Sequence, residues 1–316
     1  MAITGSTGFV GRHVVARMIA MRRNVTLLVQ SARKCPASWR DHAQIRIVET
    51  GPIEQSTQLA VALEDAATVV HLGGLAHVKS ADPARYMAAN VEATKRLAVA
   101  SIDAGVQGFL LLSSIAAVTE NAAPGRISEA TRPRPAGPYG LSKRMAEEHV
   151  AVLAAHGIFA VSLRPPLVVG ADAPGNWRSL QRLALTGAPL PFGSTSNRRA
   201  YIGVDTLAEM LDHLANHAWS HERSGAYCVA NAENLSLAEV LSLLRKAMGK
   251  QQALFPMPTQ LLNGPLILLG RRRLAQSLFG DLDIDSSAFQ STFAFSESMG
   301  IREAIHKSGS EFALSN

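Results

Sequence analysis

A glycine-rich turn near the start of the chain constrains the fold more than any other feature. Residues 1–4 are mostly apolar, the turn Gly5-Ser6-Thr7-Gly8-Phe9-Val10-Gly11 follows, and residues 14–19 then show a helical apolar pattern. In a strand–turn–helix unit, Gly5 allows the tight turn, Gly8 lets the backbone approach a pyrophosphate, and Gly11 lets the helix pack closely on the strand. The N–H groups of the helix N-terminus then face the phosphates. The spacing is G-x-x-G-x-x-G rather than G-x-G-x-x-G, so this prediction of a nucleotide site depends on its context.

Five further apolar runs follow the turn, with helical patterns between most of them. These runs cover residues 25–29, 45–48, 69–72, 109–112 and 159–163. Alternating strands and helices predict an α/β fold with a doubly wound parallel (Rossmann) sheet, whose ligands bind at the carboxyl ends of the strands. We assign residues 1–168 to a dinucleotide-binding Rossmann domain, with 200–230 returning to its sheet. Residues 169–199 and 231–316 are predicted to form a smaller, mostly helical substrate-binding lobe.

The residues after the second and fourth strands indicate the cofactor. Gln30 stands where dinucleotide folds often carry an acid for the adenosine ribose, and Arg33 and Lys34 follow it. Because no carboxylate would repel a 2′-phosphate there, the sequence favours NADP over NAD, unless the two cations are ordinary solvated loop residues. Gly73 and Gly74 are small enough for the cofactor to lie across the end of the fourth strand.

Charge and apolar pattern exclude several classes of protein. The net charge is +6, but no basic stripe alternates with aromatic residues, so a phosphate-bearing substrate fits better than nucleic acid. Cys35 and Cys228 have no partner motif and no leader is visible, which predicts a cytoplasmic protein with free thiols. The apolar run Leu261–Leu269 is shorter than the roughly 18 residues of a membrane span. Gly264 and Pro265 interrupt it, so we predict a buried or surface helix.

Tyr139 and Lys143 form a Tyr-x-x-x-Lys pair at the start of a helical pattern. Residues four apart lie on one face of a helix, so the lysine ammonium is predicted to sit beside the phenol. There it would lower the pKa of the tyrosine from about 10 toward neutrality. Such a tyrosine can give or take a proton at an alcohol carbon. The same spacing also occurs at ordinary exposed helix starts, so other parts of the chain must decide between the two interpretations.

Several segments together resemble a known family. They are, in order, Thr4–Gly11, His71–Gly74, Asn90–Thr94, Ser113-Ser114 and Tyr139–Lys143. The chain is similar over nearly its whole length to extended short-chain dehydrogenase/reductases of the NAD-dependent epimerase/dehydratase family. Within that family it looks most like the nucleotide-sugar 4-epimerases and 4-keto-sugar reductases of bacterial surface-polysaccharide synthesis. The resemblance also implies a homodimer formed through the helices that contain Val91 and Tyr139.

The resemblance implies catalytic roles for three residues. Tyr139 would be the general acid/base, Lys143 would lower its pKa and bind the nicotinamide ribose, and Ser114 would bind the reacting oxygen. Ser114 is chosen over Ser113 because the catalytic residue of the family is the second of the pair. Asn90 would support the site, although an N-cap ahead of Val91 is the alternative. The predicted cofactor-binding set is completed by Thr7, Phe9, Val10, Ile53, Leu72 and Pro166.

The chain departs from the family pattern at two places. Gly51-Pro52-Ile53 stands where the family often has Gly-Asp, so an acidic contact near the adenine is lost or left to the backbone. The usual alanine pair after the fourth strand is Gly73-Gly74. A dehydratase is also disfavoured, because Ile115-Ala116 replace the Asp-Glu pair that dehydratases carry after the active Ser/Thr.

The second half of the chain carries the predicted substrate contacts. Arg198 and Arg199 precede an apolar strand, where paired arginines can clamp a diphosphate. The resemblance implies that Arg199 binds the substrate diphosphate and that Asn176 lines the substrate, a UDP-sugar. The alternative is that the arginines are exposed loop charges. Arg271-Arg272-Arg273 is predicted as a solvated helix end, with phosphate or a membrane surface as alternative contacts. No metal is predicted, because the acids in 281–285 lack the glycine and terminal glutamate of a calcium loop.

Three functions remain open. The leading one is an NAD(P)-dependent oxidoreductase acting at C4 of a nucleotide sugar, as a 4-keto-sugar reductase or a 4-epimerase, with the reductase slightly favoured by the NADP prediction. A short-chain reductase of a non-sugar ketone is the second, and it would have no use for Arg199. A non-catalytic dinucleotide-binding relative is the third, and the presence of Tyr139 and Lys143 argues against it.

Overall fold

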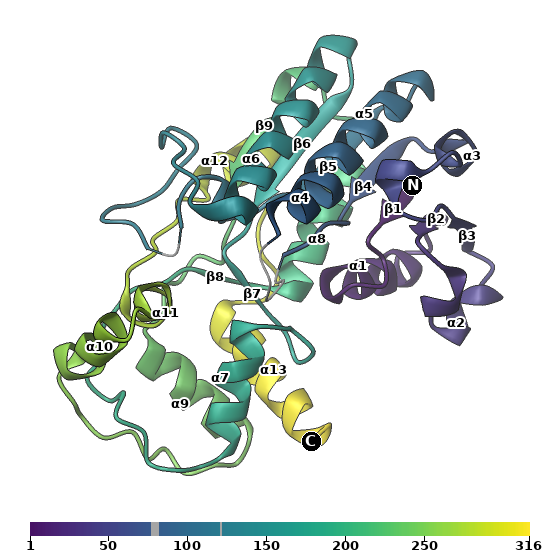
Figure 1. Cartoon of the computed structure of the whole chain (residues 1–316). Helices are drawn as coiled ribbons and strands as arrows, with labels where there is room; N and C mark the ends of the chain where they lie inside the picture. Colours follow the sequence, from purple (N-terminus) through teal and green to yellow (C-terminus); the bar gives the residue numbers. More distant parts are fainter. Residues whose placement is uncertain (77–81, 121) are drawn as a thin grey trace.

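The chain folds around one parallel sheet with helices on both faces. The computed structural model describes residues 1–76, 82–120 and 122–316 (Figure 1). Within these residues, seven parallel strands pair in the order β3-β2-β1-β4-β5-β6-β9. Their bounds are β1 Ala2–Thr4, β2 Val25–Val29, β3 Ile45–Glu49, β4 Thr68–His71, β5 Gly108–Leu112, β6 Phe159–Arg164 and β9 Gly225–Cys228. The predicted doubly wound Rossmann sheet is confirmed.

Alternating side chains along each strand bury two separate apolar cores. Ile3 belongs to the core on one face of the sheet and Ala2 to the core on the other, as the two-residue period of a strand requires. The first core is covered by α1 (Phe9–Ala20), α8 (Val204–Ala215) and α12 (Ser287–Phe293). The second is covered by α3 (Leu59–Leu63), α5 (Ala93–Asp103) and α6 (Gly137–Ala151). Helices therefore shield both faces of the sheet from water, which explains why the strands are nearly continuous apolar runs.

A helical lobe lies beyond the carboxyl ends of the strands, in the lower half of Figure 1. It has its own apolar core, which includes Trp177, Leu241 and Ile305. A small parallel sheet of β7 (Leu167–Val169) and β8 (Tyr201–Gly203) joins this lobe to the main sheet. The helices of the lobe are α7 Asn176–Leu185, α9 Leu237–Ala247, α10 Thr259–Leu268, α11 Arg272–Phe279 and α13 Ile301–Leu314. The prediction of a helical C-terminal region is confirmed.

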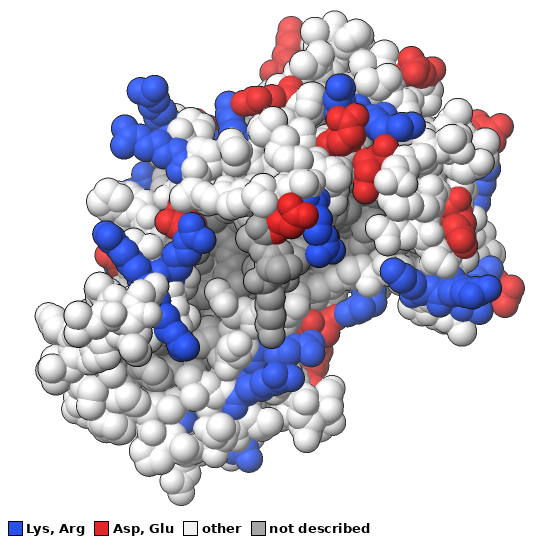
Figure 2. Space-filling model, viewed as in Figure 1, with Lys and Arg blue, Asp and Glu red and all other residues white. Residues whose placement is uncertain are grey.

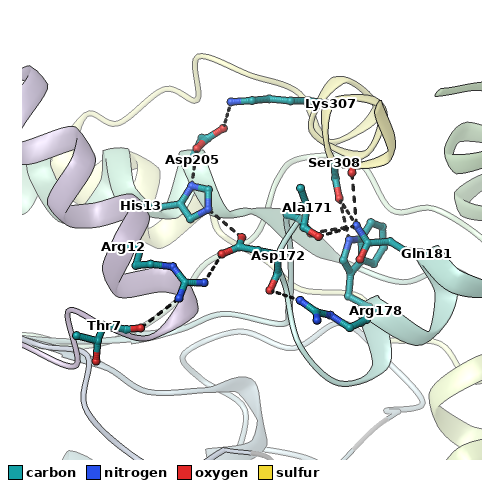
Figure 3. A network of polar contacts seen from close by, with 12 residues as sticks. Thr7, Arg12, His13, Ala171, Asp172, Arg178, Gln181, Asp205, Lys307 and Ser308 are labelled. Atoms are coloured by element: carbon teal, nitrogen blue, oxygen red, sulfur yellow. Dashed lines mark hydrogen bonds and ion pairs between the residues drawn. The ribbon is translucent and has the colours of Figure 1, made fainter. Parts of the chain in front are cut away.

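Polar contacts also tie the lobe to the first half of the chain (Figure 3). His13 on α1 lies between Asp172, which follows β7, and Asp205 at the start of α8. Lys307 of α13 pairs with Asp205 from the other side. The domain boundaries at residues 168, 199 and 230 stay predictions, because the segment 200–230 contributes both to the small sheet through β8 and to the main sheet through β9.

In the described part of the chain, no helix has the length and apolar character needed to cross a bilayer.

Candidate active site

The glycine turn fits a dinucleotide phosphate by its backbone geometry. Gly5 has a φ of 68°, and a Cβ there would lie 2.5 Å from the amide nitrogen of Gly73. A Cβ on Gly11 would lie 2.1 Å from the carbonyl oxygen of Gly5, so α1 packs on β1 as closely as only glycine permits. Gly8 caps α1, and the first turn of that helix carries no acidic side chain. Its N–H groups and helix dipole therefore face the end of β1 without a competing anion.

Ser6 supplies a second observation that fits a polar ligand at this turn. Its Oγ is buried, yet among the described residues it has no hydrogen-bond partner. Buried hydroxyl groups are nearly always paired, so an unpaired one beside a phosphate cradle suits a site built for a polar ligand. Phe9 closes the turn on the far side, since a Cβ on Gly170 would lie 2.9 Å from its ring. Thr7 and Val10 lie in the same turn and are half-buried.

The end of β2 holds a carboxylate that the sequence did not reveal. Gln30 and Arg33 are exposed there, as is Lys34 in the short helix Ala32–Lys34. Glu49, the last residue of β3, accepts a hydrogen bond from the amide of Ala32 at 2.8 Å. No acidic residue directly follows β2 in the sequence. The carboxylate of Glu49, from the neighbouring strand β3, lies there instead. The reason is the parallel register, which pairs Val29 with Glu49.

The other predicted cofactor contacts surround the same edge of the sheet. Leu72 follows β4 directly, and its amide donates to the carbonyl of Thr4 at 3.3 Å. Ile53 opens a short helix (Ile53–Gln55) beyond β3 and packs against the second core. Pro166 is buried between β6 and β7.

Tyr139, Ser114 and Lys143 converge from two elements. Ser114 follows β5, and Tyr139 lies in the first turn of α6, which Pro138 helps to start. The side chains of Ser114 and Tyr139 are joined by a hydrogen bond. Lys143 follows one turn later on α6, is buried, and its Nζ donates to the carbonyl of Leu112 at 2.8 Å. A Cβ on Gly74 would lie 3.3 Å from that Nζ, so Lys143 also borders the turn after β4.

Lys143 is not among the groups that shift the pKa of Tyr139 in this arrangement, so its predicted effect stays a prediction. Burial raises the pKa of Tyr139, the hydrogen bond with Ser114 opposes that rise, and the nearby Tyr86 adds to it. Burial also lowers the pKa of Lys143, to about 8, while Glu147 acts in the other direction. The lysine ammonium is held by the carbonyl of Leu112 rather than by the phenol. Helical spacing alone did not reveal this competing acceptor, because it comes from β5.

Glu147 explains why Ser114 and not Ser113 is available to a ligand. Ser113 donates to Glu147 Oε1 at 2.6 Å, and the same carboxylate takes two hydrogen bonds from Arg164, at 2.9 and 2.7 Å. All three side chains are buried. Ser113 is therefore part of a structural cluster, whereas Ser114 is half-buried and bonded to Tyr139. Sequence reasoning missed Glu147, although its position one turn after Lys143 on the same helix was a usable signal.

Asn90 supports the site in a way that excludes the N-cap alternative. It lies inside the π-helix η3 (Met87–Glu92), which continues directly into α5. Its side-chain oxygen accepts from the amide of Leu75 at 2.7 Å, and its nitrogen donates to the carbonyl of Leu75 and to Ser142 Oγ. Ser142 in turn donates to the carbonyl of Tyr139 at 2.8 Å. Asn90 thereby fixes the loop after β4 against the first turn of α6.

His71 was missed as a site residue, and it anchors the loop that holds Gly73. Its Nε2 lies 3.0 Å from Thr94 Oγ1, and its Nδ1 lies 2.6 Å from Thr4 Oγ1. Because Thr94 donates to the carbonyl of Asn90, it must accept from His71, which places the ring hydrogen on Nε2. Thr4 then donates to Nδ1 and accepts from the amide of Gly73. Burial, and then Lys143, lower the pKa of His71 to about 3, so the ring stays neutral.

The predicted substrate residues lie in the helical lobe. Asn176 is exposed at the first position of α7. Arg199 precedes β8, and its Nη1 donates to the carbonyls of Gln276 and Gly280 at the end of α11, at 3.2 and 2.7 Å. The other end of α11 reaches α6, since a Cβ on Gly137 would lie 3.5 Å from Arg273. The helix α11 thus runs from Arg199 toward the start of α6, and Arg198 is an exposed neighbour.

Fold and site together define a Rossmann-type dinucleotide-binding protein with a tyrosine–serine pair at the carboxyl end of its sheet. The chain belongs to the NAD-dependent epimerase/dehydratase family, whose sequence model matches residues 1–230. The predicted relation to the extended short-chain dehydrogenase/reductases is confirmed by this match.

Individual relatives and solved structures agree with the family. A UDP-glucose 4-epimerase of Vibrio cholerae is 30% identical over 99% of this chain and 95% of its own length. A ceramide reductase of Caulobacter vibrioides is 31% identical over 67% of this chain and 59% of its own length. The structure of MoeE5 in complex with UDP-glucuronic acid and NAD superposes with a TM-score of 0.77, at 25% identity, covering 100% of this chain and 99% of that one.

Proposed function

We propose that this protein is an NAD-dependent 4-epimerase of a UDP-hexose. The observation that carries the proposal is the hydrogen-bonded pair of Ser114 and Tyr139 beside Lys143 and the glycine turn. The similarity to the Vibrio cholerae UDP-glucose 4-epimerase over nearly the whole of both chains supports C4 as the reacting carbon. This similarity favours an epimerase over the 4-keto-sugar reductase, which the sequence analysis had slightly favoured.

In the proposed reaction, Tyr139 enters as the phenolate, so its Oη can take the proton of the C4 hydroxyl and later return it to the C4 oxygen. Ser114 Oγ–H donates a hydrogen bond to the same C4 oxygen and polarises it while it is a ketone. When bound, NAD would supply the hydride acceptor for C4 and the hydride donor for the opposite face of the resulting ketone. Ile115 and Ala116 next to Ser114 offer no acid or base, so water is not eliminated from the sugar.

The cofactor is proposed to be NAD rather than NADP. Arg33 and Lys34 are the features that favour NADP, and Glu49 opposes them. Its carboxylate binds the amide of Ala32 between the two basic residues and Gln30, where it would repel a 2′-phosphate. An epimerase that returns its hydride also has no need of a separate reducing cofactor. Measured dissociation constants should therefore be at least about tenfold lower for NAD than for NADP, about 1.4 kcal/mol.

The substrate diphosphate is proposed to bind near Arg199 and Asn176. Arg199 approaches α11 at one end and Arg273 approaches α6 at the other, which supports a ligand that extends from Tyr139 into the helical lobe. Exposed apolar residues on α5 and α6, including Val99 and Leu141, support the homodimer that the family implies. A role in surface-polysaccharide synthesis in the cytoplasm stays a prediction.

The decisive experiment supplies UDP-glucose, UDP-galactose and their N-acetylated forms and follows both the sugars and the absorbance of reduced cofactor. The epimerase interconverts the C4 epimers without net change in cofactor. A reductase, the second candidate, consumes NADPH or NADH in equal amount with a UDP-4-keto sugar. If the protein turns over an apolar ketone but no nucleotide sugar, the epimerase and the 4-keto-sugar reductase are both wrong and the non-sugar reductase is supported.

Replacing Tyr139 by Phe tests the acid/base. We expect kcat to fall at least about 100-fold, because the proton no longer has a carrier, while NAD binding is kept. Tyr227→Phe is the matched control. The hydroxyl of Tyr227, which lies on β9, donates to the carbonyl of Arg223 and not to a residue of the proposed site. If Tyr139→Phe keeps activity, the assignment of the acid/base is wrong.

A further inference from the structure

The helix α10 presents an apolar face that no other part of the described chain covers. None of its ten residues is buried. Leu261 is 63% exposed, Leu268 is 88% exposed and the following Leu269 is 73% exposed. Spacings of seven and eight residues place these three side chains on one face of the helix. Contiguous apolar patches of this kind on a protein surface mark interaction sites.

Positive charge accompanies this face, and negative charge is absent from the segment that carries it. Residues 251–280 contain no Asp or Glu, whereas Arg271, Arg272 and Arg273 follow α10 after Leu269 and Gly270. All three arginines are exposed, and Arg273 pairs with Glu120 across to the other half of the chain at 2.7 Å. Figure 2 shows uncharged surface over α10 with basic side chains beside it. An apolar face bordered by arginines is complementary to the acyl chains and phosphates of an anionic lipid surface.

We propose that α10 and the arginines that follow it dock the protein on the surface of an anionic membrane. A helix of ten residues is about 15 Å long, half of the roughly 30 Å of a bilayer core, so α10 would lie in the interface and not span it. Leu261, Leu268 and Leu269 enter the acyl boundary, and Arg271 and Arg272 contact lipid phosphates.

Charge also distinguishes the membrane from a second copy of the chain. Two copies that met through α10 would bring Arg271 and Arg272 of both copies close together, without an acid in 251–280 to compensate them. Like charges brought together at an interface oppose association. The ion pair of Arg273 with Glu120 and the contact of Arg199 with the end of α11 hold the docking helices beside the proposed active site. The docking surface itself does not depend on the proposed function.

The test is flotation of the full chain with vesicles of phosphatidylcholine alone or mixed with phosphatidylglycerol. We expect binding to the mixed vesicles only, weakening as salt is raised. Each arginine near an anionic surface is worth roughly a fivefold gain in partitioning, so Arg271→Glu with Arg272→Glu should lower binding at least about 25-fold. Leu268→Glu with Leu269→Glu should lower it at least about tenfold.

Matched controls separate docking from general charge and apolar effects. Arg22→Glu with Arg40→Glu reverses two exposed charges, one after α1 and one on α2 (Ala37–Arg40), and Leu314→Glu changes an equally exposed leucine at the end of α13. These variants should bind mixed vesicles as the unchanged protein does. The proposal is overturned if the unchanged protein stays unbound, if the α10 variants bind equally well, or if the controls lose binding to the same degree. Lipid-free ultracentrifugation in which only Leu268→Glu with Leu269→Glu dissociates an oligomer would assign the face to a second copy instead.

Discussion

At the scale of single residues, the buried carboxylate of Glu147 on α6 holds the ends of two neighbouring strands. It binds Arg164 at the end of β6 and Ser113 at the end of β5, and none of the three is exposed. Buried ion pairs add little net stability when both partners are present, because desolvation opposes their attraction. Removing one partner is different, since the other charge then stays buried and unpaired.

Glu147→Gln should therefore lower the free energy of unfolding by about 3–5 kcal/mol. Glu148 is the matched control, because it is 61% exposed and pairs with Arg144 only at the surface, 3.4 Å away. Glu148→Gln should change stability by less than about 0.5 kcal/mol. Denaturant unfolding of both variants measures this. If the two variants lose the same stability, the ion pair of Glu147 with Arg164 is not the cause of the loss.

At the scale of elements, the close approach of α1 to β1 decides whether the phosphate cradle exists. The carbonyl of Gly5 occupies the space in which a side chain on Gly11 would begin. Local propensity would favour alanine at a helix position. The glycine at position 11 therefore indicates that the packing of α1 on β1, and not the stability of the helix, selects the residue.

Gly11→Ala is expected to displace α1, lowering stability by about 1–3 kcal/mol. NAD affinity should also fall at least tenfold, because the N–H groups no longer converge. Gly125→Ala is the control: a Cβ there meets nothing within 4 Å, so its stability should be unchanged or higher by up to about 1 kcal/mol. Calorimetry with and without NAD gives both quantities. Unaltered NAD binding by Gly11→Ala would contradict the assigned cradle.

At the scale of the whole molecule, a charged cluster holds the two ends of the chain together (Figure 3). His13 donates to Asp172 Oδ1 at 3.1 Å and to Asp205 Oδ1 at 3.2 Å, and Lys307 donates to Asp205 at 2.6 Å. Hydrogen bonds to Asp172 and then Asp205 raise the pKa of His13 to about 9, and His13 with Arg12 lowers the pKa of Asp172 to about 2. At neutral pH the imidazolium therefore bridges α1, β7 and α8.

This raised pKa predicts a pH-dependent stability. Because the folded pKa of His13 lies above its ordinary value of about 6.5, its stabilising contribution is complete below pH 6.5 and is lost as the pH rises toward about 9. The difference in unfolding free energy between the unchanged protein and His13→Gln should shrink over that interval. Denaturation at a series of pH values measures it. A difference that does not vary with pH would mean that His13 is not charged in the folded protein.

The sequence by itself determined the strand positions, the glycine turn and the spacing of Tyr139 and Lys143. These follow from local rules, since apolar β-branched runs form strands and residues four apart share a helix face.

Only the tertiary structure decided the partners of those residues. Leu112 takes the ammonium of Lys143, 31 residues away, and the end of α11 takes Arg199, 81 residues away. Glu49 reaches the end of β2 because of strand register, and Asn90 lies in a π-helix that no local pattern predicted. Hydrogen bonds between residues so far apart depend on how the elements pack, and packing is set by both cores together rather than by any one segment.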